Sequence, residues 1–158
     1  MNKFTLAAAA AMLAAPAFAQ DMPAGDADAG AEQFERQCVA CHVVETPDGE
    51  TLAGRRANTG PNLYGVAMKQ IASVEDFRYS ASLSELGETG AVWNEENFVG
   101  YVQDPTGWLR EALDDRRARG NMAYQVRSEE DAVNLYAYLY SLAPPEEGEA
   151  MEEEASDS

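Results

Sequence analysis

Apolar residues recur at helical spacing near both ends of the chain. Gly30, Phe34 and Cys38 are four residues apart, so they share one face of a helix predicted over residues 28–37. Two aspartates are available as its N-cap: Asp26 and Asp28. A glycine inside a helix costs roughly 1 kcal/mol relative to alanine, which a close crossing of another backbone would offset. We therefore expect a second helix to pack closely at Gly30.

The last apolar pattern predicts that partner helix. Ser128 and the three acidic residues after it resemble a capping box. Apolar residues then follow at i, i+3, i+4 and i+7, and two prolines end the pattern: Ala132, Leu135, Tyr136, Leu139, Pro144 and Pro145. We expect the terminal helices to cross, with Gly30 and Phe34 packed against three residues of the last helix: Leu135, Tyr138 and Leu139.

The middle of the chain predicts shorter helices joined by irregular loops. A polar loop is expected from His42 to Gly60, a short helix is expected to start at Ser73 to Asp76, and a further loop is expected up to Trp93. Two later helices are predicted from their caps and apolar faces: one after Asn94 with Phe98, Tyr101 and Val102, and one from Pro105 with Trp108, Leu109, Ala112 and Leu113. Because no segment alternates convincingly with a period of two, we predict an all-α fold.

Both ends of the chain differ in composition from the residues between them. Residues 1–19 contain Lys3, an alanine-rich apolar run and an Ala17-Phe18-Ala19 cleavage pattern, which predicts a signal peptide. The alternative is a retained membrane anchor, but the run is shorter than the roughly 20 apolar residues that a span requires. Residues 20–143 form one domain, whereas residues 144–158 hold seven acidic and no basic residues, so we expect a disordered acidic tail.

The composition is strongly acidic, and this limits the possible partners. The chain has 28 acidic against 11 basic residues and a formal net charge of −17, which becomes one unit more negative when the leader is removed. This balance excludes nucleic acid as a general partner. A single domain of this length buries only a modest core, so a bound group is expected to supply part of the apolar centre.

The candidate chemistry lies in Cys38-Val39-Ala40-Cys41-His42, a C-x-x-C-H sequence typical of covalent c-type haem attachment. Each thiol can form a thioether with a haem vinyl group, and His42 can bind the iron. The alternatives are a thioredoxin-like redox pair, which needs a βαβ context, and a zinc half-site, which needs more ligands. Cys38 and Cys41 are the only cysteines and His42 is the only histidine, so we predict one covalent haem c.

Two further residues are candidates for the surroundings of the iron. Pro61 offers a carbonyl that can accept a hydrogen bond from the second nitrogen of His42, although Gly60-Pro61 taken alone is more often just a turn. Met122 is the candidate sixth ligand, because Met68 follows too closely after Pro61 and the other methionines lie in the leader or near the ends. The alternative for a lone methionine is that it fills a gap in the core.

The ordered set of segments resembles a known family. The segments are CVACH, GPNLYG, FRYS, Trp93, YVQDP, NMAY and LYAYL. In this order they resemble the class I c-type cytochromes, and specifically the bacterial cytochrome c2 and c-550 group of electron carriers. The resemblance covers nearly the whole domain and implies the class I cytochrome c fold, with crossing terminal helices and with helices and loops wrapped round one covalently attached haem.

The resemblance also implies roles for matching residues. Tyr79 and Trp93 look like hydrogen-bond donors to a haem propionate, Tyr101 like the phenol beside the methionine sulfur, and Tyr124 like an aromatic near the exposed haem edge. The chain departs from the family pattern in two ways. Lys69 stands where an arginine is common, and the usual ring of lysines is missing, because Lys69 is the only lysine outside the leader.

The expected function is that of a soluble, monomeric, periplasmic one-electron carrier and not of an enzyme. Its partners would be a quinol:cytochrome c oxidoreductase or periplasmic dehydrogenase, and a terminal oxidase, reductase or photosynthetic reaction centre. The alternatives are a peroxidase-like or gas-binding haem protein with an open sixth position, and a structural module without haem. The first alternative lacks a distal histidine and a pair of poised acids or bases, and it would leave Met122 idle. The second would fail a haem stain on a denaturing gel.

The basic residues gather in one segment near Met122: Arg110, Arg116, Arg117 and Arg119, with Arg127 beyond. One interpretation is a solvated helix face that pairs with Asp114 and Asp115. The other is a local positive rim that replaces the missing lysines and steers an acidic partner.

Overall fold

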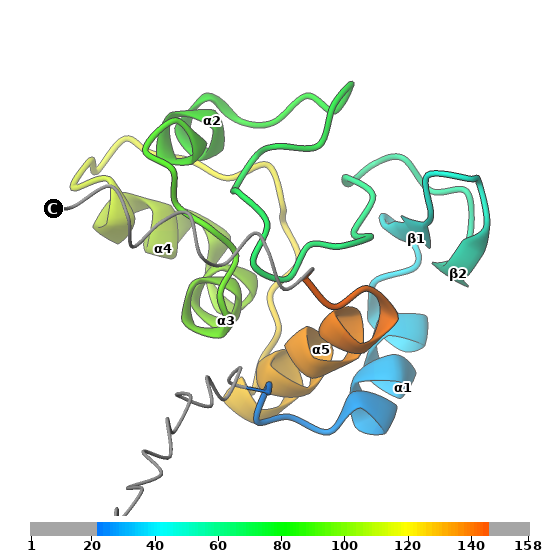
Figure 1. Cartoon of the computed structure of the whole chain (residues 1–158). Coiled ribbons are helices and arrows are strands. Elements are labelled where there is room, and N and C mark those ends of the chain that lie inside the picture. Colours follow the sequence, from blue (N-terminus) through cyan, green and yellow to red (C-terminus); the bar gives the residue numbers. More distant parts are fainter. Residues whose placement is uncertain (1–21, 146–158) are drawn as a thin grey trace, which may run out of the picture.

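The computed structural model describes residues 22–145 and contains five helices and one pair of strands in that range (Figure 1). In chain order they are α1 (Ala27–Gln37), β1 (Val43–Glu45), β2 (Thr51–Gly54), α2 (Ala81–Gly87), α3 (Glu95–Gln103), α4 (Pro105–Ala112) and α5 (Glu129–Leu142). None of these helices is long and apolar enough to cross a membrane. The predicted signal peptide, and the predicted tail beyond Pro145, lie outside the described residues.

Side-chain caps begin each helix, and three of the five caps were predicted from the sequence. Asp26, Asn94 and Ser128 accept hydrogen bonds from backbone N–H groups in the first turns of α1, α3 and α5. Asp104 ends α3 and also caps α4, where Pro105 occupies the first turn and lacks the N–H that would otherwise stay unpaired. These polar groups explain why the helices start where the sequence analysis expected them.

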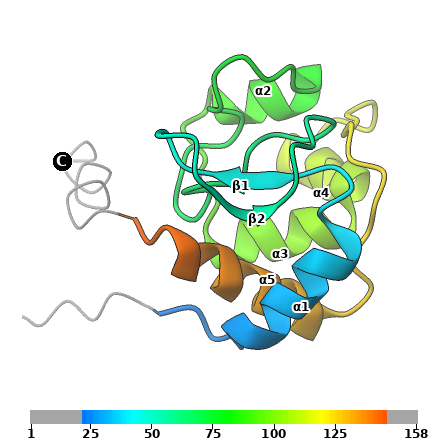
Figure 2. The same cartoon turned by 90° about the vertical axis from the view of Figure 1, so that its right-hand side faces the viewer.

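The terminal helices α1 and α5 pack closely against each other (Figures 1 and 2). A Cβ atom at Gly30 would overlap the carbonyl oxygen of Asn134, and the rings of Phe34 and Tyr138 lie 5.7 Å apart between centroids. The predicted crossing at Gly30 is confirmed. The loss of helix propensity at this glycine is offset by the close contact of two backbones.

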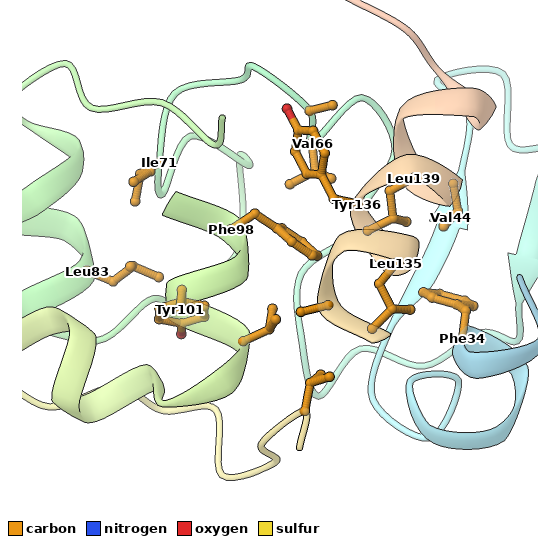
Figure 3. Close-up of a cluster of buried hydrophobic side chains, with 14 of the residues drawn as sticks. Phe34, Val44, Val66, Ile71, Leu83, Phe98, Tyr101, Leu135, Tyr136 and Leu139 are labelled. Carbon is orange, nitrogen blue, oxygen red and sulfur yellow. The ribbon is translucent and has the colours of Figure 1, made fainter. Parts of the chain in front are cut away.

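The core connects α1, α3 and α5 and extends to α2. Figure 3 shows Leu135 and Tyr136 of α5 between Phe34 of α1 and Phe98 of α3. Phe34 and Leu139 are almost completely buried, and Phe98 packs on Tyr136 with 5.4 Å between ring centroids. Tyr101 and Leu83 continue the cluster on the far side of Phe98. The core therefore lies on both sides of α3 and next to the end of α1.

Two local expectations were wrong. Part of the expected loop after His42 is a β-hairpin, because Val43 and Val44 are buried while the Pro47-Asp48-Gly49 turn reverses the chain (Figure 2). The expected helix at Ser73–Asp76 is absent, since Ala72 and Asp76 have φ values near +60° that no right-handed helix accommodates. The helix forms instead as α2, where the Ser80 side chain accepts from Leu83 N.

Candidate haem site

The Cys38–His42 stretch leaves α1 as a tight turn. The backbone N–H groups of Cys41 and His42 both donate to Cys38 O, at 3.0 Å and 2.9 Å. Cys38 and Cys41 are free thiols. The turn places both thiols and the imidazole of His42 on the wall of one cavity.

That cavity has a volume of about 550 Å³ and a mainly apolar lining. The cavity is lined by the end of α1, by the GPNLYG segment and the residues between it and α2, by α2, α3 and α5, and by the loop after α4. The apolar lining residues include Phe34, Leu63, Val66, Val74, Leu83, Phe98, Val102, Val126, Leu135 and Leu139. An apolar cavity of this size beside the core is suited to a large flat apolar ligand. The few polar groups on its wall therefore indicate which ligand it could bind.

His42 is held by two neighbouring residues. Its Nδ1 atom lies 3.0 Å from the carbonyl oxygen of Pro61, and a Cβ atom at Gly60 would overlap the imidazole ring. A carbonyl oxygen only accepts, so Nδ1 bears the hydrogen and Nε2 keeps its lone pair. Burial lowers the pKa of His42, partly opposed by the bond to Pro61. His42 is thus a neutral imidazole with Nε2 free to bind a metal ion.

The thiols do not have the properties of a redox pair. Burial, followed by the proximity of Cys41, raises the pKa of Cys38 to about 11. A thioredoxin-like pair needs a lowered thiol pKa and a βαβ context, and neither occurs around Cys38. Within residues 22–145 no group of three or more His, Cys, Asp or Glu side chains could hold a metal ion, so a zinc site has no support either.

Met122 lines the same cavity and comes from the segment between α4 and α5. Both sides of this segment are anchored, since Gly120 N donates to the Thr106 hydroxyl at 3.2 Å and Val126 N donates to Val102 O at 2.8 Å. Met68 does not line the cavity, and 39% of its surface is exposed. The position of Met122 is consistent with the predicted sixth ligand, and that role stays a prediction.

The three aromatic residues singled out in the sequence also lie at the cavity. Tyr79, Trp93 and Tyr101 all line it, and the rings of Trp93 and Tyr101 are 5.1 Å apart between centroids. Burial, followed by the nearby Tyr79, raises the pKa of Tyr101 to about 12, so its phenol stays protonated and can donate. The predicted contacts of these side chains with a haem stay predictions.

These residues together fit a covalently attached haem. Two free thiols, a neutral imidazole and a thioether surround one apolar cavity, and Gly60 leaves room for the imidazole where a side chain would fill it. The thiols and imidazole come from one turn, while the thioether comes from a segment about eighty residues later. Nitrogen and thioether donors are the axial ligands that c-type haem iron takes in electron carriers.

Parts of the cavity wall could not be predicted from the sequence. Leu83 lies on α2, a segment expected to be a loop, although Ser80 followed by Leu83 and Leu86 has the spacing of a capped helix. Asn62 was quoted only within GPNLYG, yet its side chain makes three hydrogen bonds. No local pattern in the sequence indicates Glu45 as the partner of two of those bonds, because the partner groups belong to a backbone 17 residues away.

Comparison with known proteins gives relatives of one kind. No family model matches the chain. It is 58% identical over 123 residues to cytochrome c2 of Rhodovulum adriaticum, covering 78% of this chain and 97% of the relative. It is 38% identical over 143 residues to cytochrome c-550 of Paracoccus denitrificans, covering 89% and 88%. Its structure is similar to that of cytochrome c2 from Rhodobacter sphaeroides, with a TM-score of 0.73, 46% identity and coverage of 77% and 99%.

Proposed function

Since the chain belongs to the class I c-type cytochromes of the cytochrome c2 and c-550 group, we propose that it is a periplasmic electron carrier with one covalent haem c. The family resemblance and the class I fold expected from the sequence are thereby confirmed. Electron transfer, and not enzymatic catalysis, is what its relatives perform. The observation that supports the haem most directly is the cavity shared by Cys38, Cys41, His42 and Met122.

Each of these four residues has a separate role in the proposal. The thiols of Cys38 and Cys41 attach the group through thioethers, His42 Nε2 binds the iron, and Met122 supplies the sixth ligand. The haem iron supplies one-electron chemistry by alternating between its ferric and ferrous states. The Pro61 carbonyl orients His42 and makes it a stronger donor. A filled sixth position leaves no room for an exogenous ligand, which separates a carrier from a peroxidase-like protein.

The remaining cavity residues exclude water and provide hydrogen-bond donors. The apolar side chains from α2, α3 and α5 keep the site dry, and a dry site with a neutral thioether favours the reduced state. We propose that Tyr79 and Trp93 donate to a propionate and that Tyr101 lies beside the Met122 sulfur. Their position on the cavity wall supports these roles.

The partners are proposed to be redox proteins on either side of the carrier. A quinol:cytochrome c oxidoreductase or a periplasmic dehydrogenase would reduce it, and a terminal oxidase, a reductase or a reaction centre would oxidise it. The carrier would act as a monomer. The signal peptide predicted over residues 1–19 supports a periplasmic location.

Docking is proposed to use the arginines near Met122. Arg110, Arg116 and Arg119 are exposed, while Arg117 forms an exposed ion pair with Asp115 at 3.6 Å. An exposed pair of this kind contributes only about 0–1 kcal/mol, so it leaves Arg117 free to exchange partners. Tyr124, also exposed, lines the cavity a few residues further on. The positive segment is therefore close in sequence to an accessible part of the haem cavity.

A spectrum of the exported protein tests the proposal. A haem stain on a denaturing gel should label the chain, and the ferric protein should show the weak band at the red end of the visible spectrum that reports a methionine ligand. That band should persist when cyanide or carbon monoxide is added. Rapid binding of either ligand would indicate the peroxidase-like alternative, and an unstained chain would contradict haem attachment.

A further inference from the structure

Residues 60–64 lie along one edge of β1 and are tied to it by several hydrogen bonds. Gly60 N donates to Cys41 O at 2.8 Å and Leu63 N donates to Val43 O at 2.9 Å. On the opposite edge of the same strand region, Thr46 N donates to Glu50 O. Backbone groups alternate between the two edges of a strand, so those of Glu45 face the same side as those of Val43, toward residues 60–64.

Asn62 fills that position with its side chain. Its Oδ1 atom accepts from Glu45 N at 3.0 Å and from Tyr64 N at 3.1 Å, and its Nδ2 atom donates to Glu45 O at 2.7 Å. One carboxamide thus pairs with both the N–H and the C=O of a single residue, as the backbone of a neighbouring strand would. Asn62 is half-buried, which limits competition from water.

This anchor lies directly next to the residue that orients His42. Pro61 has no N–H to donate to β1, and its carbonyl oxygen faces His42 Nδ1. The anchors on either side of it are Gly60 N, bonded to Cys41 O, and the Asn62 side chain, bonded to Glu45. Between them the Pro61 carbonyl is held 3.0 Å from His42 Nδ1.

We infer that Asn62 is a positioning residue for His42: its carboxamide fixes the Pro61 carbonyl against Nδ1 and so sets the orientation and donor strength of the imidazole. The hairpin then has a role at the site, because β1 supplies the backbone that Asn62 holds. The inference rests on the proposed function of His42 as an iron ligand. It adds a determinant of that ligand's strength which acts through two other residues, Pro61 and Glu45.

Asn62→Ala and Asn134→Ala form a matched pair for testing this. Asn134 is also half-buried, and its Oδ1 atom accepts from Asp26 N at 2.7 Å where α5 meets the start of α1, away from His42. In the haem-loaded protein, both substitutions should lower the melting temperature. Only Asn62→Ala should shift the His42 ring resonances in NMR spectra and raise the reduction potential, since a weaker imidazole donor stabilises ferric iron less.

Amide hydrogen exchange provides a measurement that does not involve the iron. Loss of the Asn62 acceptor should accelerate exchange at Tyr64 N by about tenfold, the factor expected for one lost hydrogen bond. If Asn62→Ala lowers the yield of holoprotein, the same measurements are made on Asn62→Asp. Asp keeps an acceptor for Glu45 N and Tyr64 N but places an oxygen against Glu45 O, so it should also displace the His42 resonances.

The outcomes separate this inference from the proposed function. If the protein without substitutions carries no haem, or carries haem without a histidine ligand, the proposed function is wrong. A normal histidine-ligated spectrum together with unchanged His42 resonances and potential in both Asn62 variants overturns the positioning role alone. A shift in Asn134→Ala as large as that in Asn62→Ala also overturns it, because the effect would then follow general loosening of the fold.

Discussion

The imidazole of His42 and the carbonyl of Pro61, 19 residues apart in the chain, lie 3.0 Å from each other. This contact fixes which ring nitrogen bears the hydrogen and therefore which one is available to a metal ion. It depends on a glycine beside the ring and on the asparagine after the proline. One short segment, GPN, thus defines the geometry of one side of the cavity.

Replacement of Met122 by alanine tests the sixth ligand. We expect Met122→Ala to abolish the band at the red end of the ferric spectrum, to let cyanide or imidazole bind, and to lower the reduction potential. Met68→Ala is the control, because Met68 is 39% exposed and does not line the cavity. If Met68→Ala produced these changes and Met122→Ala did not, the assignment would be wrong.

Removal of the two thiols proposed to attach the haem, Cys38 and Cys41, tests whether folding depends on haem. The cavity of about 550 Å³ lies beside the core, and an empty apolar space of that size removes contacts from all the side chains around it. We expect Cys38→Ser combined with Cys41→Ser to yield a chain without a cooperative thermal transition in circular dichroism. A sharp transition in the haem-free variant would contradict this expectation.

Substitution of Gly30 tests the crossing of α1 and α5. Alanine normally stabilises a helix relative to glycine, but here its Cβ atom would overlap Asn134 O. We expect Gly30→Ala to lower the free energy of unfolding of the holoprotein by about 1–3 kcal/mol, measured by denaturant titration. Glu32→Ala, at an exposed position of the same helix, should change it by no more than about 0.5 kcal/mol. If Gly30→Ala and Glu32→Ala lowered the free energy of unfolding equally, Gly30 would not be the point at which α1 and α5 cross.

Charge reversal near Met122 tests the docking surface. Arg116→Glu combined with Arg117→Glu should slow association with an oxidase or reaction centre at low ionic strength and weaken the dependence of that rate on salt. The spectrum and the potential should not change. Arg36→Glu is the control, since Arg36 is also exposed and paired with an acidic residue, but lies on α1. Association rates that stay at the unmodified value would instead indicate an apolar contact around Tyr124.

The helices could be predicted from the sequence because their signals are local. Asp26, Asn94 and Ser128 lie immediately before apolar residues at helical spacing, and each one caps the expected helix. The crossing at Gly30 could also be predicted, since the cost of the glycine required a compensating contact. The CVACH sequence located the candidate site, and the structure brings Met122, Tyr79, Trp93 and Tyr101 to the same cavity, although their roles toward a haem stay predictions.

The parts that were missed depend on contacts distant in sequence. Val43 and Val44 are only two residues, too few to show a period of two, and they form a strand because residues 60–64 and β2 pair with either edge. The helix expected at Ser73–Asp76 was wrong because Ser and Asp are frequent both in turns and at the starts of helices, and here they form a turn. The role of Asn62 is invisible in the sequence, because its partner is the backbone of Glu45.

The contact of Gly30 with Asn134 also has a consequence for the order of events during biosynthesis. About a hundred residues separate the two positions. Because the chain is synthesised from its N-terminus, α1 has no helix to pack against until α5 has also been synthesised and released. During that interval the core around Phe34 cannot close over Cys38 and Cys41. Haem attachment would then take place on an open chain, before burial raises the pKa of Cys38 and slows the reaction of its thiol.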